Sequence, residues 1–163
     1  MTISVSRTFV ILVSTMTIFF NFVQIQGSSM NPIIDFDAIR AAYEDVRNDD
    51  SPTVWAAFKY EGKRIVYAGH GNNYDGFLRF CTDDARIYAY VRVETGDEMS
   101  RRAKFAFITW IGPGVSPLKK AKVSTDKAFV KEACPNYDKE ILADERPEIA
   151  QRKVKAALEL AGK

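Results

Sequence analysis

The sequence is short of the residues from which most catalytic and metal sites are built. Its 163 residues contain one histidine, His70, and two cysteines, Cys81 and Cys134, with no Cys-x-x-Cys spacing. An ordinary metal site needs three or four such ligands, so histidine and cysteine cannot supply one here. A nucleophilic triad would have to use His70, which lies in the glycine loop 69–71 with no evident nucleophile. We therefore expect neither an enzyme nor a bound cofactor, and two reduced structural thiols.

Phosphate-binding motifs and a strong net charge are also missing. No third glycine follows Gly69-His70-Gly71 at the dinucleotide-binding spacing, and no Gly-Lys-Ser/Thr occurs. The net charge is only +2, with 23 basic and 21 acidic residues, which is too small for a protein that attracts nucleic acid over its whole surface. Positive charge gathers instead in three short segments, so an acidic partner would meet a local patch: 101–104, 119–122 and 152–155.

Residues 1–29 form a leader that differs in composition from the rest of the chain. Arg7 precedes an apolar run from Phe9 to Val23, broken only by Ser, Thr and Asn, and small residues follow at 27–29. This is the pattern of a secretory signal peptide, and its length and polar interruptions argue against a membrane span. Met30 directly precedes the first segment with a folded pattern, so the leader is alternatively an extension that the working protein does not use. We expect residues 30–163 to fold as one domain without it.

Hydrophobic periodicity predicts alternating helices and strands in residues 30–163. Helices are expected at 35–47, 73–82, 117–133 and 144–160, and strands at 54–60, 64–67, 85–94, 105–111 and 137–143. The last strand–helix–strand unit should be parallel and right-handed, whereas the earlier strand pairs should be antiparallel hairpins. The expected fold is α/β (α+β), with a central mixed sheet sandwiched between helices.

Three of these elements carry expectations about which side chains face inward. The segment Phe105 to Ile111 is almost entirely apolar, aromatic or β-branched, which is typical of a strand covered on both faces. In the strand 85–94 apolar residues alternate with polar and aromatic ones, which predicts a strand with one amphipathic face. One side carries Ile87, Ala89, Val91 and Val93, and the other carries Arg86, Tyr88, Tyr90, Arg92 and Glu94. Ser116 is a natural N-cap and Pro117 a natural first residue of the next helix. Its inward stripe is expected to comprise Leu118, Ala121, Thr125, Ala128, Phe129 and Ala133, leaving the lysines on the free faces.

Several short segments occur in an order that is more specific than any single motif. They are Ala41 to Asp50 (AAYEDVRNDD), Phe58 to Gly62 (FKYEG), Cys81 to Arg86 (CTDDAR), Thr95 to Ser100 (TGDEMS), Lys104 to Gly112 (KFAFITWIG) and Thr125 to Glu132 (TDKAFVKE). Over nearly all of residues 31–162 the chain resembles the coactosins, small single-domain members of the actin-depolymerising-factor (ADF) homology family and relatives of cofilin. The resemblance implies an ADF-homology fold and binding to actin filaments (F-actin) without severing or depolymerising them. It also implies interference with filament-end capping, weak or no binding to monomeric G-actin, and a cytoplasmic, monomeric protein with no nucleic-acid partner and no stable membrane insertion.

The resemblance also implies which residues contact the filament. The coactosin filament-binding lysine falls on Lys104, with Arg101 and Arg102 as its basic neighbours. The actin-facing helix falls on 117–133, where the candidates are Lys120, Lys127 and Lys131; the alternative is that these lysines are an ordinary solvated helix face. Cationic side chains on rigid elements suit the acidic outer surface of actin. Lys104 is expected to be exposed, so that Lys104→Ala should affect the fold little while strongly reducing filament binding.

The leader departs from the coactosin pattern, in which the chain is cytoplasmic and begins close to the first helix. The favoured interpretation is a cytoplasmic, cytoskeletal filament-binding protein with an unprocessed or unused leader. The alternative is a secreted protein of the same fold that binds an extracellular or host ligand. Sequencing the N-terminus of the protein from its natural source separates the two interpretations.

Overall fold

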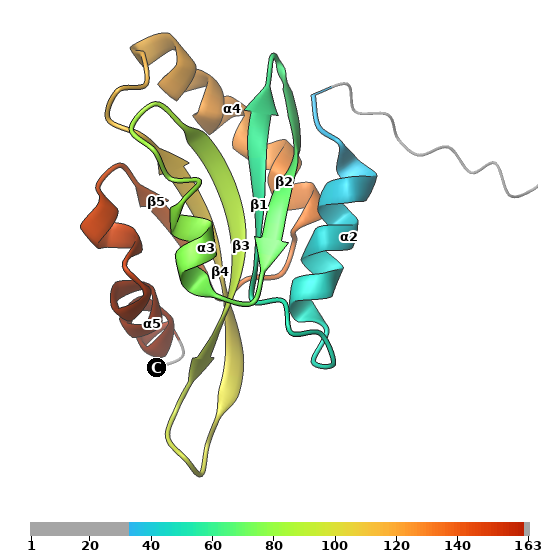
Figure 1. Cartoon of the computed structure of the whole chain (residues 1–163), viewed down its shortest axis with the longest axis vertical. Coiled ribbons are helices and arrows are strands. Elements are labelled where there is room, and N and C mark those ends of the chain that lie inside the picture. Colours follow the sequence, from blue (N-terminus) through green and yellow to red (C-terminus); the bar gives the residue numbers. More distant parts are fainter. Residues whose placement is uncertain (1–32, 162–163) are drawn as a thin grey trace, which may run out of the picture.

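The computed structural model describes residues 33–161, so the leader 1–29, Met30 and Gly162 lie outside the described residues. Within that range five strands form one sheet in the order β2-β1-β3-β4-β5, and helices cover both of its faces (Figure 1). Adjacent strands are antiparallel, except that β4 and β5 are parallel. This mixed sheet between helices is the predicted fold, and the parallel last pair is also as predicted.

The first half of the domain is one helix, one hairpin and a short helix. It comprises α2 (Phe36–Arg47), β1 (Trp55–Glu61), β2 (Arg64–Gly71) and α3 (Tyr74–Leu78). The expected helix 73–82 is therefore shortened to a five-residue α3. Strand β2 runs past its expected end at Tyr67 and includes the segment 69–71 that was expected to be a loop, because Gly71 pairs with Trp55 of β1. A Cβ on Gly71 would lie 2.9 Å from the Trp55 ring, so glycine is what allows the strand to pass this indole.

The second half consists of a long hairpin followed by a parallel crossover and a final helix. It comprises β3 (Arg86–Thr95), β4 (Arg102–Ile111), α4 (Pro117–Ala133), β5 (Lys139–Ala143), the 3-10 turn η1 (Arg146–Ile149) and α5 (Gln151–Leu160). The single helix expected at 144–160 is split, because the extended ψ of 135° at Ala150 separates η1 from α5. The hairpin of β3 and β4 extends beyond the other strands, toward the bottom of Figure 1.

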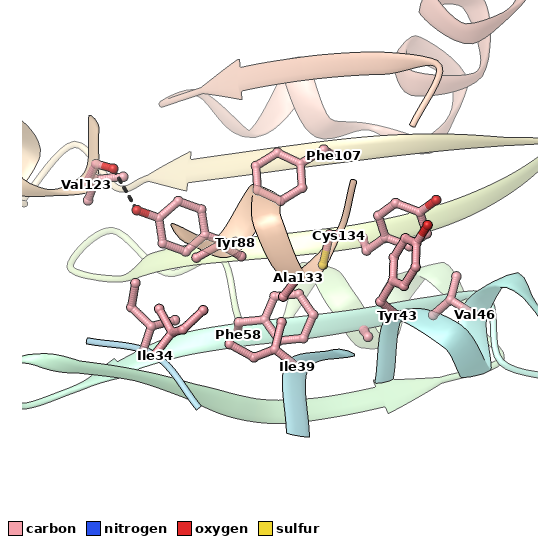
Figure 2. Packing of buried hydrophobic residues seen from close by; sticks show 14 of the residues in the cluster. Ile34, Ile39, Tyr43, Val46, Phe58, Tyr88, Phe107, Val123, Ala133 and Cys134 are labelled. Carbon is pink, nitrogen blue, oxygen red and sulfur yellow. Dashed lines mark hydrogen bonds between the residues drawn. The ribbon is translucent and has the colours of Figure 1, made fainter. Parts of the chain in front are cut away.

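One layer of the core lies between the sheet and the helices α2 and α4 (Figure 2). Tyr88 and Tyr90 of β3 are fully buried there, on the opposite side of the strand from Ile87, Ala89, Val91 and Val93, as the alternation predicts. Burial is possible because each hydroxyl has an acceptor: Tyr88 donates to the Val123 carbonyl at 2.7 Å and Tyr90 donates to the Asn136 carbonyl. Strand β3 is therefore covered on both faces.

The second layer lies on the opposite face of the sheet, under α3, η1 and α5. It contains both tryptophans of the sequence, Trp55 and Trp110, and their ring N–H groups donate to the Asn73 and Thr82 carbonyls at 2.7 and 2.8 Å. Burying a side chain of this kind contributes about 1.5–3 kcal/mol. Strand β4 supplies buried residues to both layers. The predicted burial of the strand 105–111 on both of its faces is therefore confirmed. Among residues 33–161 no helix is long and apolar enough to cross a membrane.

Candidate functional site

Helix α4 turns a different side toward the core from the one expected. Its buried residues are Val123, Asp126, Val130 and Ala133. Of the expected inward stripe only Ala133 is buried, while Phe129 packs against the core from a partly buried position. The rest of that stripe faces solvent and leaves an uncharged strip along the helix, made of Leu118, Ala121, Thr125 and Ala128. Leu118 is 84% exposed, so the free face of α4 is uncharged from Leu118 to Ala128 and ends at the exposed Glu132.

A buried carboxylate explains this orientation. The Asp126 side chain is 2% exposed; it accepts a hydrogen bond of 3.0 Å from the Tyr60 hydroxyl and forms an ion pair with Lys122 at 2.7 Å. Burial raises the pKa of the Tyr60 phenol, so Tyr60 remains a donor. A buried carboxylate is costly unless it is paired and hydrogen-bonded. These contacts therefore fix the rotation of α4 on the sheet.

Lys127 and Lys131 lie together on the side of α4 that faces β5, where both contact Glu140. Lys127 forms an ion pair with one carboxylate oxygen of Glu140, and Lys131 contacts the other oxygen at 2.8 Å. Partial burial raises the pKa of Glu140, but the hydrogen bonds from the two lysines outweigh this effect and hold that pKa below its ordinary value. Glu140 is therefore ionised at neutral pH, and two candidate filament-binding lysines are already paired inside the protein.

Lys120 lies near the start of α4, apart from this pair. It lines a cavity of about 190 Å³ together with Ile111, Leu142, Ala143, Asp144 and Glu148. Leu142 of the edge strand β5 is 62% exposed. Within residues 33–161 no salt bridge involves the Lys120 ammonium group. Lys120, which is partly buried, and the exposed Leu142 line the same cavity, and the exposed Leu118 stands in the first turn of the same helix; we call these three residues the helix patch.

Arg101 and Arg102 lie at the tip of the β3–β4 hairpin, and both are exposed. Gly96 takes the turn with a φ of 92°, and a Cβ there would lie 2.3 Å from the Ser100 carbonyl oxygen. The Asp97 carboxylate accepts hydrogen bonds from the Met99 N–H at 3.0 Å and the Ser100 hydroxyl at 2.8 Å, and these bonds lower the pKa of Asp97. Met99 is 96% exposed beside the two arginines. We call Met99, Arg101 and Arg102 the hairpin patch.

Lys104 is not exposed, which corrects the expectation from the sequence. It is 9% exposed, and its Nζ donates a hydrogen bond of 2.7 Å to the Leu158 carbonyl in the last turn of α5. The alternation along β4 could have revealed this position, because Lys104 has the same parity as Ala106, Ile108 and Trp110, which all face the α5 layer. The ammonium group thus joins the root of the hairpin to the final helix instead of facing solvent.

The candidate residues therefore fall into separate groups. Arg102 pairs with Thr95 at the hairpin end of β4, whereas Ile111 at the opposite end leads into α4. Ten residues of strand span about 30 Å, so the hairpin patch and the helix patch are held apart by a rigid strand of that length. Lys127, Lys131 and Glu140 form a third group on the side of α4.

The cysteines and the histidine of the described residues lie apart from one another. Within residues 33–161 no group of three or more His, Cys, Asp and Glu side chains could hold a metal ion. Cys81 and Cys134 are free and buried, and burial raises the pKa of Cys81 to about 12, which leaves its thiol unreactive at neutral pH. The single histidine, His70, hydrogen-bonds with the Tyr67 hydroxyl in an exposed position.

The comparisons with known proteins agree with the fold. Residues 33–159 match the family described as cofilin/tropomyosin-type actin-binding protein, and the chain belongs to that family. Within the family its resemblance is to the coactosins. It is 49% identical to human coactosin-like protein over 129 residues, which cover 79% of this chain and 91% of the human protein.

Solved coactosin structures have the same fold. Crystal structures of human coactosin-like protein superpose with a TM-score of 0.76 at 48% identity, covering 78% of this chain and 98% of the human chain. The solution structure of mouse coactosin, described as an actin filament binding protein, matches with a TM-score of 0.69 at 46% identity, covering 80% of this chain and 92% of the mouse chain. The matched part corresponds to the described domain.

Proposed function

We propose that this protein binds the sides of actin filaments through the hairpin patch and the helix patch. The observation that carries the proposal is the surface itself, in a chain of the cofilin/tropomyosin-type family. A rigid helix presents an uncharged strip, and exposed arginines stand at the tip of a rigid hairpin. Desolvating an uncharged strip costs little, and cations at its border select an acidic partner.

The distance between the two patches favours a filament over a monomer as the partner. Two contact surfaces about 30 Å apart on one stiff sheet fit a polymer that repeats its surface along an axis. A single actin molecule that contacts only one patch would bind more weakly, because binding at one patch would not then bring the second patch close to its own contact site. We therefore propose strong binding to F-actin and weak or no binding to G-actin, by a monomer of this chain.

The resemblance to coactosins supports the finer features of the proposal. These are binding that leaves filaments neither severed nor depolymerised, interference with end capping, and action in the cytoplasm without enzymatic activity or cofactor. Lys127 and Lys131 are secondary contacts in this proposal because Glu140 already pairs with them. Lys104 supports the root of the hairpin, because its ammonium group is bonded to α5.

Co-sedimentation of the full chain with actin filaments at rising salt tests the proposal. We expect pelleting at low salt that weakens steadily as salt is added, without nucleotide or metal, because exposed charges are screened over about 10 Å at 0.1 M salt. Filament lengths should not change when the protein is added. Absence of pelleting at low salt would refute the assignment, and shortened filaments would refute the non-severing mode.

The secreted alternative depends on residues 1–29, which lie outside the described residues. Its supporting observation is the signal-like pattern of that leader. N-terminal sequencing of protein from its natural source decides between the two locations. A start at Met1 or Met30 supports the cytoplasm, whereas a start near Ser28 supports secretion.

A further inference from the structure

Glu140 occupies a position that its role in the fold does not explain. It lies on the edge strand β5, and its carboxylate stands between Lys127 and Lys131 of α4. The Tyr137 hydroxyl also donates to it at 3.4 Å, and the Lys131 ammonium group lies 5.3 Å from the centre of the Tyr137 ring. One carboxylate therefore holds two ammonium groups and draws both toward the sheet edge.

This cluster remains accessible from solvent. The exposed fractions are 28% for the Lys127 side chain, 34% for Lys131 and 29% for Glu140. Ion pairs exposed to this degree contribute little to stability. The ion pairs do determine where the two ammonium groups point. They also reduce the positive potential that reaches a partner, because two cations and one anion together carry a net charge of only one.

We infer that Glu140 is an internal competitor for the acidic groups of the filament and so limits the affinity of the α4 surface. The inference rests on the proposed function, since it concerns the same surface. A carboxylate of the partner can bind Lys127 or Lys131 only by displacing Glu140. Much of the free energy gained in the new ion pair is therefore offset by the loss of the ion pair with Glu140. Binding is then selective for partners that present several acidic groups together.

Glu140→Gln in the full chain tests this role, because glutamine keeps the size of the side chain and its hydrogen-bonding oxygen but removes the charge. We expect filament affinity in co-sedimentation to rise by about three- to tenfold at low salt, with a steeper salt dependence, because two cations are released. The matched control is Glu61→Gln. Glu61 is an exposed carboxylate in the β1–β2 turn region and lies outside both patches; its replacement changes the net charge equally and should leave affinity within about twofold of wild type.

A double-mutant cycle identifies the mechanism. The pair Lys127→Gln and Lys131→Gln removes two positive charges in either background, but in the wild-type background, where Glu140 holds both lysines, it should weaken filament binding less than in the Glu140→Gln background. In the Glu140→Gln background the same pair should remove the whole gain. An equal loss in both backgrounds overturns the inference, as does a folded Glu140→Gln variant that binds like wild type.

The outcomes remain separable from those of the proposed function. If the wild-type chain does not pellet with filaments at low salt, the proposed function fails. If it pellets and Glu140→Gln does not bind more tightly, only the role of Glu140 fails. If Glu140→Gln melts at a lower temperature, the comparison of the two lysine losses still decides whether Glu140 masks the lysines, because an equal loss in both backgrounds contradicts masking.

Discussion

The Nζ of Lys104 lies 2.7 Å from the carbonyl oxygen of Leu158. Leu158 is in the last turn of α5, where carbonyl groups have no partner within the helix and the helix dipole is negative. Lys104 thus supplies a positive donor to a helix end that needs one. The bond spans 54 positions of sequence and joins the hairpin to the end of the domain.

Lys104→Ala should therefore destabilise the fold. Losing the buried bond leaves the Leu158 carbonyl unsatisfied and removes the lysine stem, and we expect a loss of about 1–3 kcal/mol in the free energy of unfolding. Urea denaturation measures this. The matched control is Lys119→Ala on the exposed first turn of α4, which should stay within about 0.5 kcal/mol. Equal stabilities for the two variants would show that the Lys104 bond contributes nothing.

Asp126→Ala should loosen α4 on the sheet. The substitution removes the acceptor of the Tyr60 hydroxyl and the partner of Lys122. We expect the free energy of unfolding to fall by about 1–3 kcal/mol. Lys122 is 40% exposed and can be rehydrated, so the loss should not reach the value for a fully buried pair. Tyr60→Phe should cost less, and in a thermal melt the double variant should be less destabilised than the sum of the two single variants. A fully additive result would contradict coupling through the hydrogen bond.

Gly76→Ala should be destabilising although it lies in a helix. Alanine favours the helical backbone over glycine by about 1 kcal/mol, but a Cβ on Gly76 would lie 2.8 Å from the Trp55 ring. The ring cannot easily move away, because its N–H group is bonded to the Asn73 carbonyl at 2.7 Å. We expect overpacking to lower the free energy of unfolding by about 1–3 kcal/mol overall, which thermal unfolding measures. A rise in melting temperature would show that the helix propensity of alanine outweighs the steric clash between its Cβ and the Trp55 ring.

Arg101→Ala combined with Arg102→Ala should reduce filament pelleting without changing the melt. Both side chains are exposed at the hairpin tip, so the fold does not depend on them, and the loss of two cations should flatten the salt dependence. Arg152→Ala combined with Lys153→Ala on the exposed surface of α5 removes the same charge elsewhere and serves as the control. An equal effect of both double variants would indicate non-specific attraction to the filament instead of a hairpin contact.

The order of helices and strands could be predicted from the sequence because each element repeats its apolar residues with its own period. The inward side of α4 could not. Alanine, threonine and the stems of lysine suit both core and surface, so the stripe from Leu118 to Ala128 fits the helical period as well as the buried side does. The decisive residue, Asp126, is charged, and its burial depends on Tyr60, 66 positions away. No local pattern contains that information.

The candidate site was predictable to a different degree in each of its parts. The exposed arginines of the hairpin follow from the turn at Gly96, and their exposure is as expected. Lys104 follows the alternation of β4 into the layer under α5, whereas its charge alone predicts an exposed position. The pairing of Lys127 and Lys131 with Glu140 requires the parallel placement of β5 beside β4 and the position of α4 above that edge. Such a contact emerges only after the chain has folded.

The two layers of the core can be followed separately by spectroscopy. Both tryptophans lie in the layer under α3 and α5, whereas Tyr43, Tyr88 and Tyr90 lie in the layer under α2 and α4. Tryptophan emission therefore reports on the face of the sheet opposite to the helix that carries the proposed contacts, and tyrosine absorbance reports largely on the face beneath it. A ligand or variant that loosens α4 alone would change the tyrosine signal while the tryptophan spectrum stays constant.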